Sequence, residues 1–195
     1  MPARLAVLEK FIGELRAIWA AEPENQRRME RAKPLLEKFV MEPSLKAHSA
    51  QWPSTEGHKN LLLYVDPEHD FVINAVVRVP GRKGSVHDHA DAWVLYGLLD
   101  GTESLERYDR LDDGSKPGYA EIRLASVTTG TQGKVDLVPP RNIHAEQGGP
   151  TRSVAIIVRS QKLGQGTVLQ GRYDPKTNTR REGHGPTQVP FELVG

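Results

Sequence analysis

The amino-acid sequence predicts an all-β barrel or sandwich that is preceded by α-helices. From about residue 60 onward, short β-rich runs recur at regular spacing between turn residues, which is typical of all-β folds and not of alternating β/α units. Before that point, apolar residues recur at three- and four-residue steps, the period of an amphipathic helix. The 195 residues suffice for one domain with a sizeable core.

Residues 1–58 are expected to form a helical extension that packs on the barrel. The apolar stripe of its first helix contains Leu5, Leu8, Phe11, Ile12, Leu15, Ile18 and Trp19. A second helix is predicted over residues 24–41, broken or restarted at Pro34, because proline suits a first helical turn. A role of these helices in binding a partner stays open as the alternative.

Residues 59–163 are expected to form the barrel itself. The predicted strands are 61–65, 71–79, 92–99, 103–110, 119–126, 134–138 and 153–158. Two of them end at the strong turn signals Pro80-Gly81 and Asp100-Gly101. Residues 164–195 are rich in Gly, Pro, Thr and charge, and we expect an extended tail of the same domain that wraps the surface.

The composition excludes several classes of function. Lys and Arg number 26 against 25 Asp and Glu, so neither a nucleic-acid partner nor a basic membrane patch is expected. There is no cysteine, which excludes disulfides, thiolate metal sites and cysteine nucleophiles. Charges interrupt every apolar stretch, so no membrane span is expected. The first ten residues lack the apolar run of a signal peptide, and a cytoplasmic monomer or homodimer is therefore expected.

Three histidines carry the chemistry of this sequence. His87 and His89 are separated by one residue, and residues i and i+2 of a strand point to the same face. His144 lies in another β-like stretch and can complete a face of three nitrogens. This pattern predicts an open, catalytic type of metal site. The other histidines of the chain are expected at the surface, and for His58 a place in the wall of the pocket stays open as the alternative, since loops often carry functional groups.

The spacing around these histidines resembles the two motifs of the cupin family. In that family a glycine and five residues precede His-x-His, as Gly81 precedes His87 here. The second motif is a glycine, five residues, a proline, four residues and a histidine, as in Gly133, Pro139 and His144. The resemblance implies a double-stranded β-helix, a small jelly-roll barrel whose interior holds the metal.

One departure from the cupin pattern narrows the resemblance to a subfamily. Cupins place a metal-binding glutamate three or four residues after the second histidine, where this chain has Trp93 and Val94. Segment 86–101 resembles the cysteine dioxygenase family, which has His-Asp-His, lacks that glutamate and carries N-terminal helices. This resemblance implies that His87, His89 and His144 are the ligands of iron. It also places Lys59 near the arginine with which that family binds a carboxylate.

The resemblance to thiol dioxygenases does not extend to the strand after the last ligand. Ala155, Ile157 and Arg159 stand where that family has serine, histidine and tyrosine. Arg159 lies in an apolar strand, where it either faces solvent or points inward and pairs with an anion. Tyr96 and Trp93 are expected in the pocket wall or the core. Lys59, Trp93, Tyr96 and Arg159 are therefore the candidate substrate-binding residues.

The predicted chemistry is Fe(II)-dependent oxygenation of a small anionic chelating substrate, a thiol first. Three neutral imidazoles leave a ferrous ion its full charge and about three open positions for substrate and O2. Zn, Ni or Mn stay open as the metal, and non-oxidative isomerase or hydrolase chemistry or ligand binding without turnover as the function. Glu146 and Asp91 share strand parity with His144 and His89. They are expected to contact ligating imidazoles or to be exposed, and not to be metal ligands.

Overall fold

The chain begins with three helices and continues as a β-barrel. The structure, a computed structural model, describes residues 3–162 and 169–195. Its helices are α1 (Ala6–Ala21), α2 (Asn25–Phe39) and α3 (Pro43–Ser49). The strands in the described residues are β1 (Lys59–Val65), β2 (Val72–Arg78), β3 (Val86–His87), β4 (Val94–Asp100), β5 (Thr102–Arg110), β6 (Ile122–Thr131), β7 (Val135–Val138), β8 (Ile143–Gly148), β9 (Ser153–Arg159), β10 (Gln170–Asp174), β11 (Thr179–Gly183) and β12 (Thr187–Pro190).

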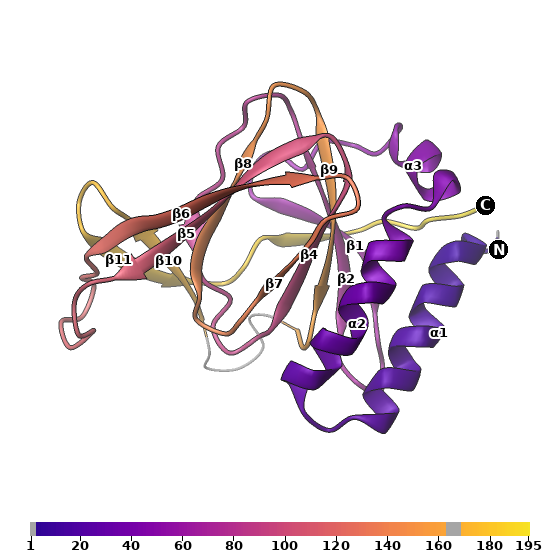
Figure 1. Ribbon diagram of the computed structural model, residues 1–195, viewed down its shortest axis with the longest axis horizontal. Helices are drawn as coiled ribbons and strands as arrows, with labels where there is room; N and C mark the ends of the chain where they lie inside the picture. The colour runs from indigo at the N-terminus through magenta and orange to yellow at the C-terminus, as the bar shows by residue number, and fades with distance from the viewer. Residues whose placement is uncertain (1–2, 163–168) are drawn as a thin grey trace.

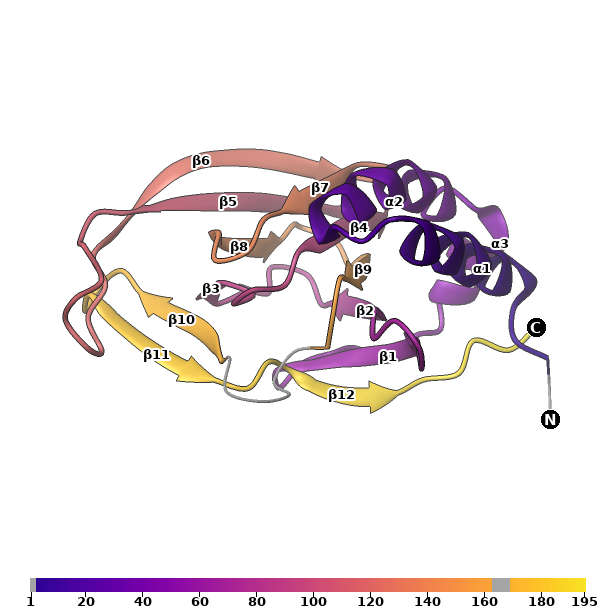
Figure 2. The same ribbon diagram turned by 90° about the horizontal axis from the view of Figure 1, so that it is seen from below.

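The strands form two six-stranded sheets that face each other (Figures 1 and 2). The first sheet has the order β12-β1-β2-β9-β4-β7, and the second has the order β11-β10-β3-β8-β5-β6. All neighbouring strands within these sheets run antiparallel except β1 and β12, which are parallel. The predicted fold class, an all-β double-stranded β-helix with N-terminal helices, is confirmed.

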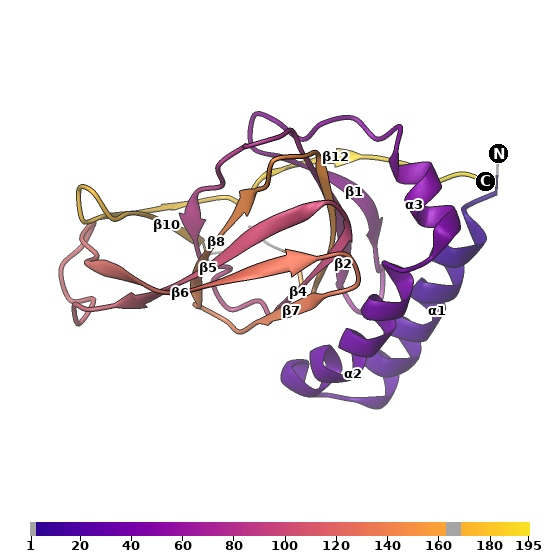
Figure 3. The same ribbon diagram turned by 45° about the horizontal axis from the view of Figure 1, so that its top comes forward.

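The helices cover the outer face of the first sheet, at the end of the molecule where both termini lie (Figure 3). The central strands of this sheet are therefore buried on both faces, which explains why their sequences read as continuous apolar runs. On β4, Leu95 and Leu99 pack toward the helices, whereas Val94, Tyr96 and Leu98 point into the barrel. The same alternation along β2 and β9 sets which of their residues can reach an interior site.

The second helix differs from its prediction. Helix α2 is continuous through Pro34 and ends at Phe39, before residues 40 and 41, and a separate helix that was not predicted, α3, follows over Pro43–Ser49. A proline inside a helix removes one backbone hydrogen bond. The buried face of α2, which packs against the barrel, offsets this loss and contains Met29, Ala32, Leu36 and Phe39. Among the described residues, no helix is long and apolar enough to span a membrane.

The C-terminal segment differs from the expected extended tail. It forms three strands: β10 pairs with β3 and β11, and β12 pairs with β1. The expected boundary between barrel and tail at 163/164 lies outside the described residues. The physical reason for the pairing is that β1 and β3 otherwise expose unpaired backbone groups at a sheet edge. Both sheets are thus completed by the last quarter of the chain.

Candidate metal centre

The three predicted histidines meet between strands β3 and β8. His87 on β3 lies directly opposite His144 on β8, and His89 follows two residues after His87. One ligand nitrogen from each ring lies within 4.8 Å of the other two. The Nε2 atoms of His89 and His144 are 3.1 Å apart, and both residues are buried. Pairing of β3 with β8 therefore brings together three imidazoles from two segments, and His89 and His144 are 55 positions apart in the sequence.

Each imidazole is held from behind by a polar group. His87 Nδ1 lies 2.9 Å from the carbonyl of Ser85, and His144 Nδ1 lies 2.8 Å from the carbonyl of Asn142. Because a carbonyl only accepts, both Nδ1 atoms donate, and neutral rings then present unprotonated Nε2 atoms to the centre. Such backing is the usual setting of metal-binding histidines.

His89 has a backing group of a different kind. Its Nδ1 lies 3.1 Å from the side-chain amide nitrogen of Gln170, which is buried in β10. In this orientation the amide nitrogen donates to Nδ1, whereas a half-turn of the amide would let its oxygen accept from a protonated Nδ1. Strand β10 thus supplies a hydrogen-bond partner for His89, for which the sequence carries no local signal.

The electrostatics of the cluster favour neutral rings. Burial, with the nearby His144, lowers the pKa of His87 to about 4 and holds the pKa of His89 well below its usual value. Both rings are uncharged at neutral pH, and the uncharged ring is the form that binds a metal. The donor set, its spacing and its backing groups therefore fit a divalent metal ion.

Asp88, the residue between the first two histidines, fixes the loop that carries them. Its carboxylate accepts hydrogen bonds from the Tyr173 hydroxyl (2.6 Å), the Gly171 amide (3.0 Å) and the Ala90 amide (2.8 Å). Burial would raise the pKa of Asp88, but these hydrogen bonds outweigh it and lower the pKa. A side chain at position 171 would collide with this carboxylate, since a Cβ there would lie 2.3 Å from Asp88 Oδ2.

Replacing Asp88 with alanine is expected to lower the free energy of unfolding by about 3 kcal/mol, because three donors lose their acceptor. Chemical denaturation of metal-free protein measures this change. The matched control is Asp91→Ala, which removes an exposed ion pair with Arg141 (2.8 Å) and should cost at most about 1 kcal/mol. Equal stability of the two variants would contradict this role of Asp88.

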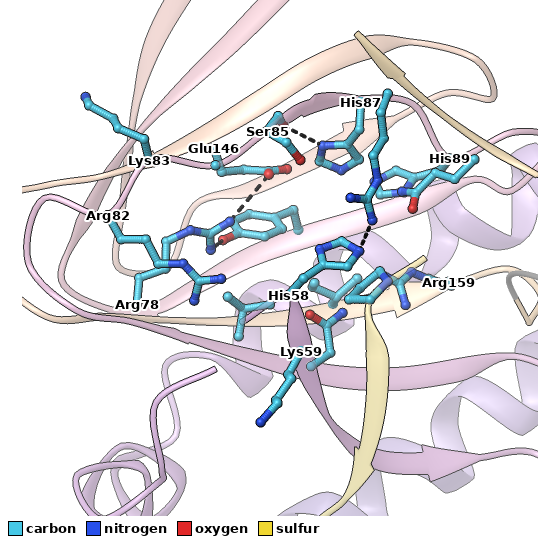
Figure 4. A pocket seen from close by; sticks show the side chains of 18 residues that line it. His58, Lys59, Arg78, Arg82, Lys83, Ser85, His87, His89, Glu146 and Arg159 are labelled. Atoms are coloured by element: carbon cyan, nitrogen blue, oxygen red, sulfur yellow. Dashed lines mark hydrogen bonds and ion pairs between the residues drawn. The ribbon is translucent and has the colours of Figure 1, made fainter. Parts of the chain in front are cut away.

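A cavity of about 310 Å³ opens beside the histidines (Figure 4). Its wall includes His87, His89 and one carboxylate, Glu146. The remaining charged groups are cationic and comprise Lys59, Arg78, Arg82, Lys83, Arg159 and Arg172. At the mouth, His58 contacts the Arg172 guanidinium, and burial together with this cation lowers the pKa of His58. The cavity is thus suited to an anion.

Arg159 points into the barrel and lines this cavity. It donates from Nη1 to Asn74 Oδ1 (2.7 Å), whereas its Nε has no hydrogen-bond partner in the part of the chain that the structure describes. No carboxylate of the described residues lies within 4.0 Å of its guanidinium. Burial lowers the pKa of Arg159 to about 10, so it remains charged at neutral pH.

The other candidate substrate-binding residues occupy different positions. Tyr96 points inward and lines the cavity. Lys59 lies at the rim, exposed, and its ammonium points away from the histidines (Figure 4). Trp93 is a correction: it packs with the cluster under the helices, on the opposite face of the first sheet, and does not line the cavity. Trp93 directly precedes β4 and lies three residues before Tyr96, so it is out of phase with that inward-facing residue.

A buried polar network beside the cavity was missed from the sequence. Arg78 Nη1 donates to the Tyr96 hydroxyl (2.6 Å), and that hydroxyl donates to Glu103 Oε2 (2.7 Å). Glu103 Oε1 accepts from the Ser153 hydroxyl (2.6 Å) and lies 3.4 Å from Arg78. The available signal was a charged or polar residue in an apolar run, since Arg78 and Ser153 lie at the ends of the predicted strands 71–79 and 153–158.

Glu146 is buried and lies on the same face of β8 as His144. Its Oε1 is 3.3 Å from His144 Nε2, and its Oε2 is 3.5 Å from Arg78 Nη2. It does not face solvent; it joins the polar network to the histidine cluster. Asp91, considered beside it, is exposed and pairs with Arg141.

No protein-family model matches the sequence. The chain is similar to an uncharacterized double-stranded β-helix protein from Klebsiella pneumoniae (TM-score 0.43, 15% identity, 63% of this chain and 85% of that one). It is also similar to the Cnp3 cupin domain of Schizosaccharomyces pombe (0.41, 12%, 53% and 60%) and to an oxalate oxidase in complex with glycolate (0.44, 16%, 57% and 56%). The matches to the last two span less than two thirds of those chains. At these identities the likeness concerns the fold alone.

Proposed function

We propose that this protein is a metal-dependent oxygenase that acts on a small anionic substrate, with Fe(II) as its metal. The observation that carries this proposal is the convergence of His87, His89 and His144, the first two of which line a cationic cavity. Three imidazoles without thiolates and with free coordination positions are typical of non-haem iron sites and of catalytic zinc sites. A ferrous ion, when bound, supplies the redox chemistry with O2.

The residues of the cavity would select and hold the substrate. Arg159 lines the cavity with a guanidinium whose Nε has no partner among the described residues, and its planar fork suits binding of a carboxylate at the far end of the substrate. The cavity of about 310 Å³ limits the substrate to a small molecule. The excess of cations around it favours an anion and disfavours neutral analogues.

A thiol carboxylate is the first substrate class to test. The resemblance of segment 86–101 to the cysteine dioxygenase family supports a thiol, and the buried Arg159 supports a carboxylate in the same molecule. A diketone or a hydroxylated aromatic is the second class, because either can bind a metal as an anion. The apolar Ile157, which lines the cavity where thiol dioxygenases carry a polar group, favours a substrate with an apolar middle.

The experiment is oxygen uptake by protein loaded anaerobically with Fe(II) and then given a substrate panel. The panel comprises cysteine, cysteamine, 3-mercaptopropionate and simple diketones, so that cysteamine serves as the thiol without a carboxylate. Substrate-dependent uptake with 3-mercaptopropionate or cysteine, and weaker uptake with cysteamine, is expected. Iron-loaded protein that consumes no oxygen with any compound would overturn the oxygenase proposal. Oxygen uptake with cysteamine equal to that with 3-mercaptopropionate or cysteine would show that the substrate needs no carboxylate.

A further inference from the structure

The carboxylate of Glu146 lies beside His144, next to the compact group that the three histidines form. Ligand atoms that are about 2.1 Å from a metal and at right angles to each other are about 3 Å apart. His144 Nε2 has two neighbours near that spacing: His89 Nε2 at 3.1 Å and Glu146 Oε1 at 3.3 Å. Glu146 is thus at the distance from His144 that a neighbouring ligand of the same ion would have.

The short distance between Glu146 Oε1 and His144 Nε2 requires a positive charge between these two atoms. His144 Nδ1 donates to the Asn142 carbonyl, so in the neutral ring Nε2 carries a lone pair. A carboxylate oxygen 3.3 Å from that lone pair is repelled unless a proton or a metal ion lies between them. A proton accounts for these two atoms alone, whereas a metal ion also accounts for the convergence of His87 and His89.

Arg78 holds the carboxylate in the orientation that such a ligand requires. Its Nη2 lies 3.5 Å from Glu146 Oε2, which leaves Oε1 turned toward His144. The same guanidinium is fixed by Tyr96 and Glu103. Metal-binding carboxylates are commonly oriented by a hydrogen-bonded partner on the second oxygen.

The backbone around Glu146 is also fixed from the side of β3. Gly84 packs against Glu146, where an added Cβ would lie 2.4 Å from the Glu146 carbonyl oxygen, and Gly84 N donates to Gln147 Oε1 (2.9 Å). Only a residue without a side chain permits this approach. The segment that carries His87 is therefore held directly against the strand that carries Glu146.

From this geometry we infer that Glu146 is a metal ligand, so that the centre has three histidines and one carboxylate. The carboxylate then comes from two residues after the last histidine, and not from the segment after His89, where Trp93 and Val94 stand. Four protein ligands leave two positions of a six-coordinate ion, enough for one substrate atom and O2. The inference rests on the metal-dependent function proposed above, and it restricts that function to a substrate that binds the metal through one atom.

The test compares Glu146→Gln with Glu103→Gln in the full chain. Both variants remove a buried carboxylate beside Arg78, but only Glu146 faces His144. Chelator competition with Zn(II), and anaerobically with Fe(II), measures the affinity. We expect Glu146→Gln to weaken binding at least about tenfold, and Glu103→Gln to change it by no more than about twofold. Equal affinity of the two variants would overturn the inference.

A second measurement covers the case in which a variant does not fold. In a crystal structure of the wild-type protein loaded with Zn(II), a Glu146 oxygen is expected about 2.0–2.2 Å from the metal. A distance beyond about 3 Å would overturn the inference. Failure of the wild type to bind either metal would overturn this inference and the proposed function together. Normal metal binding through Glu146 without oxygen uptake would overturn the oxygenase alone.

Discussion

Replacing His144 with alanine is expected to weaken divalent metal binding by at least about 100-fold, because it removes the ligand at the centre of the cluster. His144 Nε2 lies 3.1 Å from His89 Nε2 and 3.3 Å from Glu146 Oε1. His87→Ala and His89→Ala should reduce metal content in the same direction. Metal content after purification and chelator competition with Zn(II) measure the effect.

The barrel should remain folded in these variants. The two main apolar clusters of the barrel are formed by other residues, so circular dichroism should keep the strand-rich spectrum of the wild type. The matched control is His69→Ala, which removes a half-buried histidine of the turn between β1 and β2 that does not line the cavity. Full metal occupancy in all three cluster variants would show that these histidines do not form the site.

Replacing Arg159 with methionine is expected to raise the substrate KM by about 10- to 100-fold, the loss that follows from removing a charge-assisted hydrogen-bonded pair. Metal content should be unchanged, because Arg159 contacts Asn74 and not the histidine nitrogens. Steady-state oxygen uptake with the best substrate of the panel, together with metal analysis, measures both quantities. The KM of Arg159→Lys should fall between that of the wild type and that of Arg159→Met, since lysine keeps the charge and loses the planar fork.

The same substitution should not lower the stability of the fold. Arg159 is a buried cation with an unpartnered Nε and no carboxylate within 4.0 Å in the described residues, so an apolar side chain of similar length removes a desolvation cost. The melting temperature of Arg159→Met should equal or exceed that of the wild type. A large fall in melting temperature with an unchanged KM would assign Arg159 to the fold and remove it from the substrate site.

The fold class followed from the sequence because its signals are local. A regular succession of short β-rich runs and turn residues predicts an all-β domain, and helical periodicity predicts the N-terminal helices. The spacing of His87 and His89 works in the same way, since the pleat of a strand puts both rings on one face. His144 was assigned to the metal site because its distances in sequence from Gly133 and Pro139 match the second cupin motif.

Strand parity and pairing limited the rest of the prediction. A slip of one residue reverses which side chains enter the barrel, so Arg159 could not be assigned inward, and Trp93 could not be assigned to the core rather than to the pocket wall. The pairing of β10 with β3 and of β12 with β1 joins residues that are 85 and 128 positions apart, for example Arg172 with His87 and Thr187 with Lys59, and no local signal exists for such pairing. The C-terminal segment was therefore expected as a tail.

The sequence by itself determined the all-β barrel, its helical extension and the three histidines, because each depends on a short, periodic pattern. Only the tertiary structure decided which charges accompany them. The pairing of β3 with β8 and the alternation along β2 and β9 turn Arg78, Glu146 and Arg159 toward one cavity. The physical reason is that convergence of side chains from separate strands depends on the registers between those strands, which distant contacts fix.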